Sequence, residues 1–400
     1  MTLVTLALTA FGIVMVYSAT SASAVVGGAN PMSYLERQGT YAVLGVAGMV
    51  VASRWKYTRL RALSPMLIGC ALVGCAAVLV LAQPINGARR WISFGPATFQ
   101  PSELAKLALT VWLAAYLAKR KPPRTLQELW RPIGALLAVF LVLILLEPDL
   151  GTAITLALMV GAVLFASGTR GRTLAGGFLL MAALGMLVVL SKSYMRARFF
   201  SFLDPWRDPQ GAGFQIVQAE IGLGSGGFLG EGLGQGVQKI HYLPEAHTDM
   251  IFAVIGEELG LAGAASLIFA YVLFAWAGLK TALHCRDPFG KRLAAGLTAL
   301  VCGQAFINLA AVLGLAPLTG IPLPFVSYGG SSLVVELFSV GILLNIAGNG
   351  ARAAAEMPDR GRRNGRTRAA GAGGRRRAAE PQRPRDVRRV AGSRRSAARS

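Results

Sequence analysis

The stretch K-I-H-Y-L-P-E-A-H-T-D-M-I-F-A-V-I-G-E-E-L-G occupies residues 239–260. A long apolar run begins at Met250, and the last polar side chains before it are those of Glu245, His247, Thr248 and Asp249. A carboxylate at the edge of such a run meets a lower dielectric than water while staying reachable from outside, and this setting tunes acids and bases. Asp249 is therefore a candidate catalytic carboxylate, although Thr and Asp are also common N-caps.

The composition is that of a protein embedded in a membrane. Of 400 residues, 54% are hydrophobic and 15% are charged, and the mean hydropathy is +0.52. These values exclude an ordinary soluble domain, because apolar segments dominate the length. The four cysteines show neither a metal-ligand pattern nor the spacing of a disulfide framework. We interpret the fold class as an all-α polytopic membrane protein.

The number of spans follows from the length of an apolar helix that crosses a bilayer, which is about 20 residues. By this measure we predict about ten transmembrane helices, with a large outer loop at residues 192–248 between spans 7 and 8. The predicted spans cover residues 3–20, 39–53, 66–83, 102–118, 133–147, 150–167, 174–191, 250–278, 294–315 and 332–348.

The basic residues predict the orientation. Of the 40 Lys and Arg residues, 31 follow spans 2, 4, 6, 8 and 10. Because basic loops remain in the cytoplasm, we predict that both termini are cytoplasmic. The first span resembles the apolar part of a signal peptide, with a small-residue A-S-A at 22–24, but it lacks a charged leading region, so we expect it to be retained.

We divide the chain into a transmembrane domain at residues 1–348 and an Arg-rich cytoplasmic tail at 349–400. From residue 350 onward the tail carries 16 Arg and four acidic residues with few apolar ones, which predicts disorder. A polybasic tail beside a span favours binding to anionic lipid. We expect no nucleic-acid binding, because no aromatic residues are interleaved with the arginines.

Two motifs on the predicted outer side carry cations. Arg89, Arg90 and Trp91 either anchor a helix end at the membrane interface or hold a phosphate through charge-assisted hydrogen bonds. Glu103 and Lys106 are three residues apart and so share one helix face. They form either a self-neutralising ion pair or the lining of a polar cavity.

Two further segments are rich in glycine or hydroxyl groups. Residues 322–332 predict an irregular backbone at membrane depth, where Ser327, Tyr328 and Ser331 either bind a sugar or pyrophosphate or only redirect the chain. The sequence G-x-G-x-x-G at 222–227 matches the dinucleotide fingerprint, but it lacks the strand and helix that this fingerprint needs. We expect flexible turns or close backbone approach to a ligand there instead.

Deeper in the span after Asp249, the pair Glu257 and Glu258 suggests a hydrated interior. Gly256 falls nearly beneath Asp249 on the same helix face. We expect this glycine to leave room for a substrate.

With these residues in view, the chain resembles the SEDS family, and its FtsW branch more than its RodA branch. The resemblance covers nearly all of residues 1–348 and is carried by six segments in the same order. They are N-G-A-R-R-W-I (86–92), Q-P-S-E-L-A-K-L (100–107), E-P-D-L-G-T-A (147–153), F-L-D-P-W-R-D-P (202–209), L-P-E-A-H-T-D (243–249) and L-P-F-V-S-Y-G-G-S-S (323–332).

The resemblance implies a ten-span peptidoglycan glycosyltransferase that polymerises lipid II at the outer face of the cytoplasmic membrane during division. It implies a class B penicillin-binding transpeptidase and other divisome membrane proteins as partners, and Asp249 as the catalytic residue. Asp249 either deprotonates the acceptor hydroxyl or holds a divalent cation, Mg or Mn; no other cofactor is implied. Our candidates for substrate binding are Arg90, Trp91, Glu103, Lys106, His247, Ser327, Tyr328 and Ser331.

Three alternatives remain open at this point. A lipid II flippase would use the same charges but needs an inner-facing route. A RodA-like elongation polymerase would perform the same chemistry away from the division site. A division scaffold without activity would not need Asp249, Glu103 or Lys106.

Overall fold

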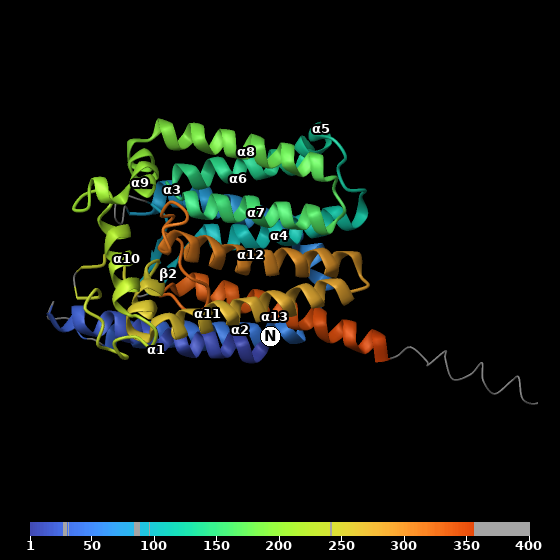
Figure 1. Cartoon of the computed structure of the whole chain (residues 1–400). Coiled ribbons are helices and arrows are strands. Elements are labelled where there is room, and N and C mark those ends of the chain that lie inside the picture. Colours follow the sequence, from blue (N-terminus) through green and yellow to red (C-terminus); the bar gives the residue numbers. More distant parts are fainter. Residues whose placement is uncertain (27–29, 31, 84–88, 96, 241, 356–400) are drawn as a thin grey trace, which may run out of the picture. The chain divides into compact units, whose positions relative to one another are not determined.

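The computed structural model describes residues 1–355 except 27–29, 31, 84–88, 96 and 241. Residues Met1–Arg352 form one compact unit. In this unit, long helices run side by side (Figure 1). The predicted disorder of the tail concerns mainly residues 356–400, which lie outside the described part, as do the first residues of the predicted motif at 86–92.

The described elements are almost entirely helical. The α-helices are α1 (Thr2–Val26), α2 (Met32–Arg54), α3 (Thr58–Leu81), α4 (Pro101–Lys119), α5 (Leu126–Leu129), α6 (Ala135–Leu146), α7 (Leu150–Ala166), α8 (Gly171–Ser191), α9 (Ser193–Leu203), α10 (Phe214–Ser225), α11 (Ile251–His284), α12 (Pro288–Val312) and α13 (Gly330–Ala355). A π-helical turn (η1, Trp130–Gly134) joins α5 to α6, and a 3-10 turn (η2, Pro205–Arg207) follows α9.

Each of the ten predicted spans coincides with a helix: α1 to α4, α6 to α8, and α11 to α13. Among the described residues, seven helices are long and apolar enough to cross a membrane, and α7 is a shorter apolar helix. The helix α2 begins seven residues earlier than predicted, and α3 begins eight residues earlier. The polytopic helical architecture is thus as predicted, and the number of membrane crossings stays a prediction.

A short hairpin is the departure from an all-α fold. Strands β1 (Ile92–Phe94) and β2 (Ala97–Phe99) pair antiparallel, with Ser93 opposite Thr98. Gly95 turns the chain between them with φ +62°, a conformation that glycine adopts without strain. Strands of three residues carry too little alternation for a sequence pattern to show.

The centre of the unit is built by α4 and α12. Both helices bury residues around most of their circumference, and in Figure 1 they run between α6, α7 and α8 on one side and α1, α2 and α11 on the other. Pro101 and Pro288 occupy the first turn of these two helices, where no backbone N–H is lost from the hydrogen-bond ladder. Asp287 caps α12 by accepting from the backbone N–H groups of Phe289 and Gly290.

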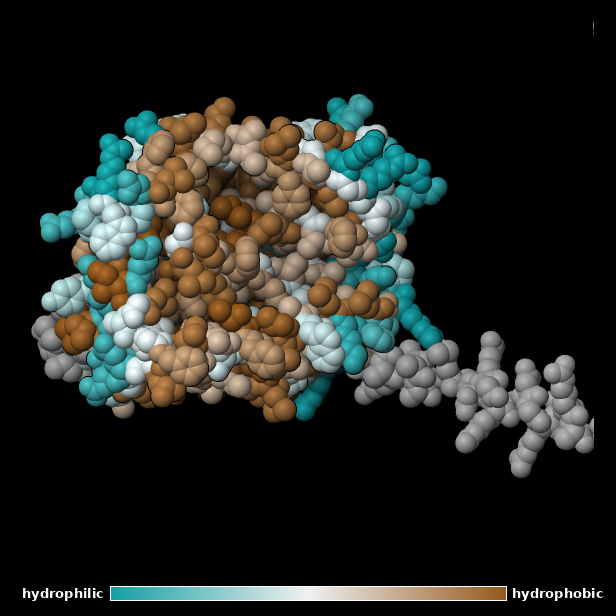
Figure 2. All heavy atoms as spheres, in the orientation of Figure 1, coloured by the Kyte–Doolittle hydropathy of each residue, from teal (hydrophilic) through white to brown (hydrophobic). Residues whose placement is uncertain are grey.

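A broad apolar surface surrounds the helices. Figure 2 shows a hydrophobic belt between two hydrophilic edges. Large side chains in this belt are more than half exposed on several helices, for example Val73, Leu179 and Phe269. Because soluble proteins rarely expose contiguous apolar patches of this extent, the belt is the surface that faces lipid.

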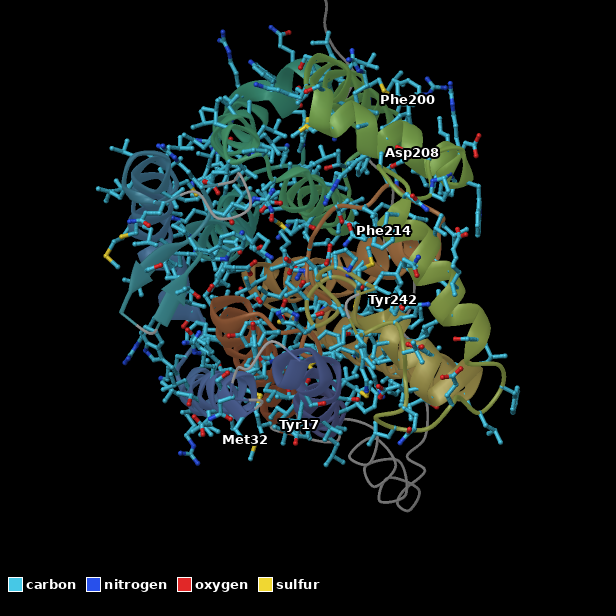
Figure 3. All side chains as sticks on the ribbon, turned by 90° about the vertical axis from the view of Figure 1, so that its left-hand side faces the viewer. Tyr17, Met32, Phe200, Asp208, Phe214 and Tyr242 are labelled. Carbon is cyan, nitrogen blue, oxygen red and sulfur yellow. The ribbon has the colours of Figure 1, made fainter. Side chains whose placement is uncertain are left out.

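The two hydrophilic edges are different in structure. One edge, here called the α9 end, carries α9, α10 and the segment from residue 226 to residue 250; Figure 3 looks onto it, with Phe200, Asp208 and Phe214 along the α9–α10 side and Tyr242 nearer the middle. The opposite edge, the α5 end, carries α5 and the connections α2–α3, α4–α5, α7–α8 and α11–α12.

The segment after α10 is fastened to α11, which corrects one expectation. Glu258 accepts from Lys239 Nζ at 2.6 Å and from Ser18 Oγ at 2.8 Å, and Glu257 accepts from the backbone N–H of Val237 at 2.7 Å. These carboxylates hold a loop and α1 against α11 rather than lining a hydrated interior. The sequence could not show this, because their partners lie far away along the chain.

Glycines permit the close approach of this segment to α11. Gly260 interrupts α11 with φ +64°, and a Cβ there would lie 2.4 Å from the backbone N of Gly230. The backbone of this segment therefore approaches the backbone of α11 closely, whereas an approach to a ligand at the 222–227 motif stays a prediction. Gly256 does not leave room for a substrate, because a Cβ there would lie 2.3 Å from the Leu223 side chain, which fills the space.

Candidate active site

Asp249 lies in the last turn before α11, at the α9 end. Its position is fixed by Asn308 of α12, whose Nδ2 donates to the backbone O of Asp249 at 2.7 Å and to the backbone O of Ile321 at 2.9 Å. The hydroxyl of Thr248 donates to its carboxylate at 3.3 Å. Asn308 was missed by the sequence analysis, although an amide inside an apolar span is a detectable signal.

Burial raises the pKa of Asp249 to about 6, and the carboxylate is only 8% exposed. The charge of Arg198 opposes this rise in pKa, and the charge of Glu245 adds to it. The carboxylate is therefore mostly ionised at neutral pH but close enough to its pKa to accept a proton.

Arg198 of α9 is the cation beside Asp249. A Cβ placed on Gly320 would lie 3.9 Å from Asp249 Oδ2 and 3.8 Å from Arg198 Nη1, so the two groups flank the same glycine. Gly320 has φ +71° and no side chain that would separate them. The sequence analysis considered only Arg89 and Arg90 as phosphate ligands on the predicted outer side. Arg198 lies in the predicted outer loop and meets the same criterion, but it was missed.

A small cavity of about 40 Å³ joins Arg198 to Arg90. Its other walls come from the α6–α7 corner, the end of α8, α9 and the segment before α13: Pro148, Leu150, Val189, Met195, Phe199, Pro317, Leu318 and Thr319. The predicted candidate Arg90 thus reaches the cavity, whereas its neighbour Trp91 does not line it. Two guanidinium groups on one cavity provide a site for a phosphate or pyrophosphate.

The corner Glu147-Pro148-Asp149 positions Arg90. Arg90 donates Nε to the backbone O of Glu147 at 3.0 Å and Nη2 to the backbone O of Pro148. Asp149 caps α7 by accepting from the Thr152 backbone N–H at 3.0 Å. The Glu147 side chain is fully buried, and burial raises its pKa to about 8, with Asp149 adding to the rise and Arg90 opposing it.

Glu103 and Lys106 form the predicted ion pair, with 2.8 Å between Nζ and Oε1, and both side chains are 3% exposed. Lys106 also donates to Gln304 Oε1 at 2.7 Å, and Gln304 donates to Glu336 at 3.1 Å. Glu336 in turn accepts from the backbone N–H of Phe325 at 3.1 Å. The pair belongs to a buried network that holds the 322–325 segment, and it does not line the cavity.

Gln304 and Glu336 were missed by the sequence analysis. Each is a polar residue alone in an apolar span, and such residues are rarely without function. Gln304 also donates to the backbone O of Pro322 at 3.0 Å, and Tyr271 donates to the backbone O of Pro324. The irregular backbone predicted at 322–332 is therefore covered by protein, as irregular backbone at membrane depth must be.

His247 and Tyr328 lie together with Tyr34 of α2. The ring centroids of His247 and Tyr328 are 5.5 Å apart, and Tyr34 is 5.1 Å from His247 and 5.3 Å from Tyr328. Burial lowers the pKa of His247, which favours its neutral form at pH 7. Burial raises the pKa of Tyr328, and a hydrogen bond with Arg37 opposes this rise. The cluster offers aromatic faces and polar edges at the α9 end.

The two candidate serines have partners within the protein. Ser327 Oγ accepts from the backbone N–H of Leu323 at 2.7 Å, and Ser327 is 3% exposed. Ser331 Oγ accepts from the backbone N–H of Gln100 at 3.1 Å and so joins α13 to the start of α4. Both hydroxyls shape the site, and their binding to a substrate stays a prediction.

The donor set around Asp249 bears on the predicted divalent cation. Among the described residues, no three His, Cys, Asp or Glu side chains come together as metal ligands would. One carboxylate with substrate phosphates suits Mg²⁺, but Arg90 and Arg198 already place two positive charges at this cavity. These surroundings do not fit a resident metal ion, and we derive no step through one.

The fold and the site define a polytopic membrane protein in which the buried carboxylate of Asp249 stands beside a cationic cavity at one end of the helices. Residues 1–351 match the model of the family described as cell cycle protein, FtsW, RodA and SpoVE, and the chain belongs to this family. The expected membership of the SEDS family is thereby confirmed.

Similar proteins extend this result. The chain is 44% identical over 351 residues to the probable peptidoglycan glycosyltransferase FtsW of Geobacter metallireducens, covering 86% of this chain and 93% of that one. It is 37% identical over 353 residues to stage V sporulation protein E of Bacillus subtilis, covering 86% and 95%.

Solved structures share the fold. A chain from a peptidoglycan synthase complex, studied for its coordination of polymerization and crosslinking, superposes with a TM-score of 0.73 at 32% identity and covers 87% of this chain and 97% of that one. The rod shape determining protein RodA of Thermus thermophilus superposes with a TM-score of 0.63 at 29% identity, covering 87% and 95%.

Proposed function

We propose that this chain is a peptidoglycan glycosyltransferase that polymerises lipid II into glycan strands at the outer face of the cytoplasmic membrane during cell division. The observation that carries the proposal is the placement of Asp249, with a pKa of about 6, beside a cavity lined by Arg90 and Arg198. The FtsW-named relatives support the division role over an elongation role.

The orientation is part of the proposal. The basic connections gather at the α5 end, and by the positive-inside rule this supports a cytoplasmic position for this end and for both termini. The α9 end with Asp249 then faces outward, where lipid II is used. A flippase is supported less well, because the described residues of the candidate site gather at the α9 end.

The proposed reaction is a displacement at the anomeric carbon of the donor. The 4-hydroxyl of the acceptor GlcNAc forms the new C–O bond while its proton passes to the Asp249 carboxylate. The bond between the anomeric carbon and the pyrophosphate breaks, and its electron pair leaves with undecaprenyl pyrophosphate. Arg90 and Arg198 stabilise the charge that develops on this leaving group.

The size of the cavity is the reason to propose a partner protein. A volume of about 40 Å³ holds roughly three water molecules, which is too small for a pyrophosphate. Lipid II therefore requires that α9 or the 317–319 segment move outward. We propose that a class B penicillin-binding transpeptidase, bound at the α9 end, favours this open form; the likeness to a chain of a peptidoglycan synthase complex supports such a partner.

The proposal is tested by incubating the purified full-length chain and its transpeptidase with labelled lipid II in detergent and separating the products on a glycan-strand gel. We expect strands, and we expect EDTA not to abolish them. Because transport has no meaning in detergent, strands would exclude a pure flippase. Absence of strands from the complex would contradict the proposal.

Arg198 gives a prediction about pH. Its guanidinium lowers the pKa of Asp249, so replacing it in Arg198→Gln raises this pKa further above 6. An opposite charge a few ångströms from a carboxylate lowers the pKa of that carboxylate by about one unit. In the pH profile of kcat/KM for polymerisation, we therefore expect the acidic limb of Arg198→Gln to shift upward by about one pH unit.

Two controls accompany this measurement. Arg198→Lys keeps the charge and should leave the limb near the position of the wild type. Arg207→Gln removes an exposed cation that does not line the cavity and should not move the limb. An unchanged limb in Arg198→Gln would show that Asp249 is not the base that the profile reports.

A further inference from the structure

A second, larger cavity of about 380 Å³ lies at the α5 end. Its residues come from the end of α4, the α4–α5 connection, α5 and η1: Tyr116, Leu117, Arg120, Lys121, Pro123, Glu128, Arg131 and Ile133. The 19 residues of α4 separate it from the candidate active site by about 28 Å. None of these residues belongs to the proposed reaction.

The rim of this cavity is cationic. Arg120, Lys121 and Arg131 are exposed and face one acidic residue, Glu128. The Glu128 carboxylate accepts from the backbone N–H of Arg124 at 2.8 Å and so serves the start of α5. Neither of the two ion pairs found among the described residues involves a residue of this rim. The rim therefore carries an excess of positive charge.

One of the three cations is already held in place. The guanidinium of Arg120 lies over the Tyr116 ring at 4.8 Å from the centroid, and its Nη1 donates to the Tyr116 hydroxyl at 3.0 Å. Tyr116 in turn stacks on Trp112 with 5.2 Å between centroids. This packing reduces the side-chain entropy that an anion would otherwise have to remove on binding.

The floor of the cavity is apolar. Leu117 is 1% exposed, Ile133 is 3% exposed, and Pro123 is buried. A free phosphate would leave this floor uncovered, whereas the glycerol and first acyl carbons of a lipid would cover it.

The surroundings place the cavity at the membrane interface. Leu126 and Trp130 are about half exposed beside it, and Trp is enriched where lipid meets water. In Figure 2, hydrophilic side chains gather at this corner directly beside the hydrophobic belt. A headgroup in the adjoining leaflet therefore reaches the rim without leaving the bilayer.

We propose that this cavity binds the phosphate of an anionic phospholipid of the phosphatidylglycerol class from the cytoplasmic leaflet, with Arg120, Lys121 and Arg131 contacting the phosphate. The assignment of the leaflet depends on the orientation proposed above, but the binding does not depend on polymerase activity. None of the residues of this cavity belongs to the Arg-rich tail at 349–400.

The test uses native mass spectrometry of the full-length protein in a neutral detergent, titrated with dioleoylphosphatidylglycerol. The double variant Lys121→Gln/Arg131→Gln removes two cations and leaves the packing of Arg120 on Tyr116 intact. We expect this double variant to bind the tightest bound lipid about tenfold to 30-fold more weakly, because it lacks two basic residues. Arg54→Gln/Lys56→Gln removes two exposed cations from the α2–α3 connection at the same end and should keep the affinity of the wild type.

Two further arms identify the ligand. Dioleoylphosphatidylcholine has the same chains but no net charge, and we expect it to bind at least about tenfold more weakly than the anionic lipid. Inorganic phosphate should not compete at equal concentration. Equal lipid binding by the wild type and the cavity variant, equal losses in both double variants, or binding of inorganic phosphate without the lipid would each overturn the proposal.

Discussion

Asp249→Asn is expected to lower the rate of lipid II polymerisation at least about 100-fold, because the amide cannot accept the proton of the acceptor hydroxyl. The substitution keeps the shape of the side chain, and the backbone O that accepts from Asn308 is unchanged. Membrane insertion and thermal stability should therefore stay near those of the wild type. The rate is measured from glycan strands formed by the purified complex at pH 7.5.

Two variants make this result specific. Glu36→Gln removes an exposed carboxylate from α2 and should retain full activity. Asp249→Glu restores a carboxylate one methylene longer and should recover part of the rate. If Asp249→Asn made strands at the wild-type rate, Asp249 would have no catalytic role.

Lys106→Met is expected to have the largest effect on stability, about 3–5 kcal/mol, because it leaves Glu103 and Glu336 buried without a cation. The methionine nearly preserves the volume and apolar stem of lysine, so the loss reports the charge rather than a cavity. The free energy of unfolding is measured by titrating the purified protein in mild detergent with a denaturing detergent.

The double variant Lys106→Met/Glu103→Gln distinguishes the network from simple packing. Removing the carboxylate of Glu103 as well removes one of the unpaired charges, so the double variant should be more stable than Lys106→Met alone. A double variant less stable than the sum of the two single variants would contradict a charge-balanced network.

Much of the fold could be predicted from the sequence because apolar length alone marks a membrane helix. Each of the ten predicted spans coincides with a helix, although α2 and α3 begin earlier than the apolar runs indicated. The hairpin at 92–99 was not predicted, because its strands have three residues each and no apolar period.

The candidate site could be predicted only in part. Asp249 and the pair Glu103 and Lys106 could be recognised in the sequence, because these polar residues lie beside or inside apolar runs. Arg198, Gln304 and Glu336 act through partners that lie far along the chain, and a single sequence contains no record of such pairs. The same reason explains why Glu257 and Glu258 were wrongly interpreted, since their partners include backbone N–H groups of residues 234–238.

The interruption at Gly260 divides α11 into two parts of different length. Unbroken, the 34 residues of α11 would extend about 51 Å, far beyond a hydrocarbon core of about 30 Å. The 24 residues after Gly260 extend about 36 Å and account for the crossing by themselves. When the membrane becomes thinner or thicker, we therefore expect this longer part to tilt, while the shorter part, which Asp249 precedes, keeps its register with α12.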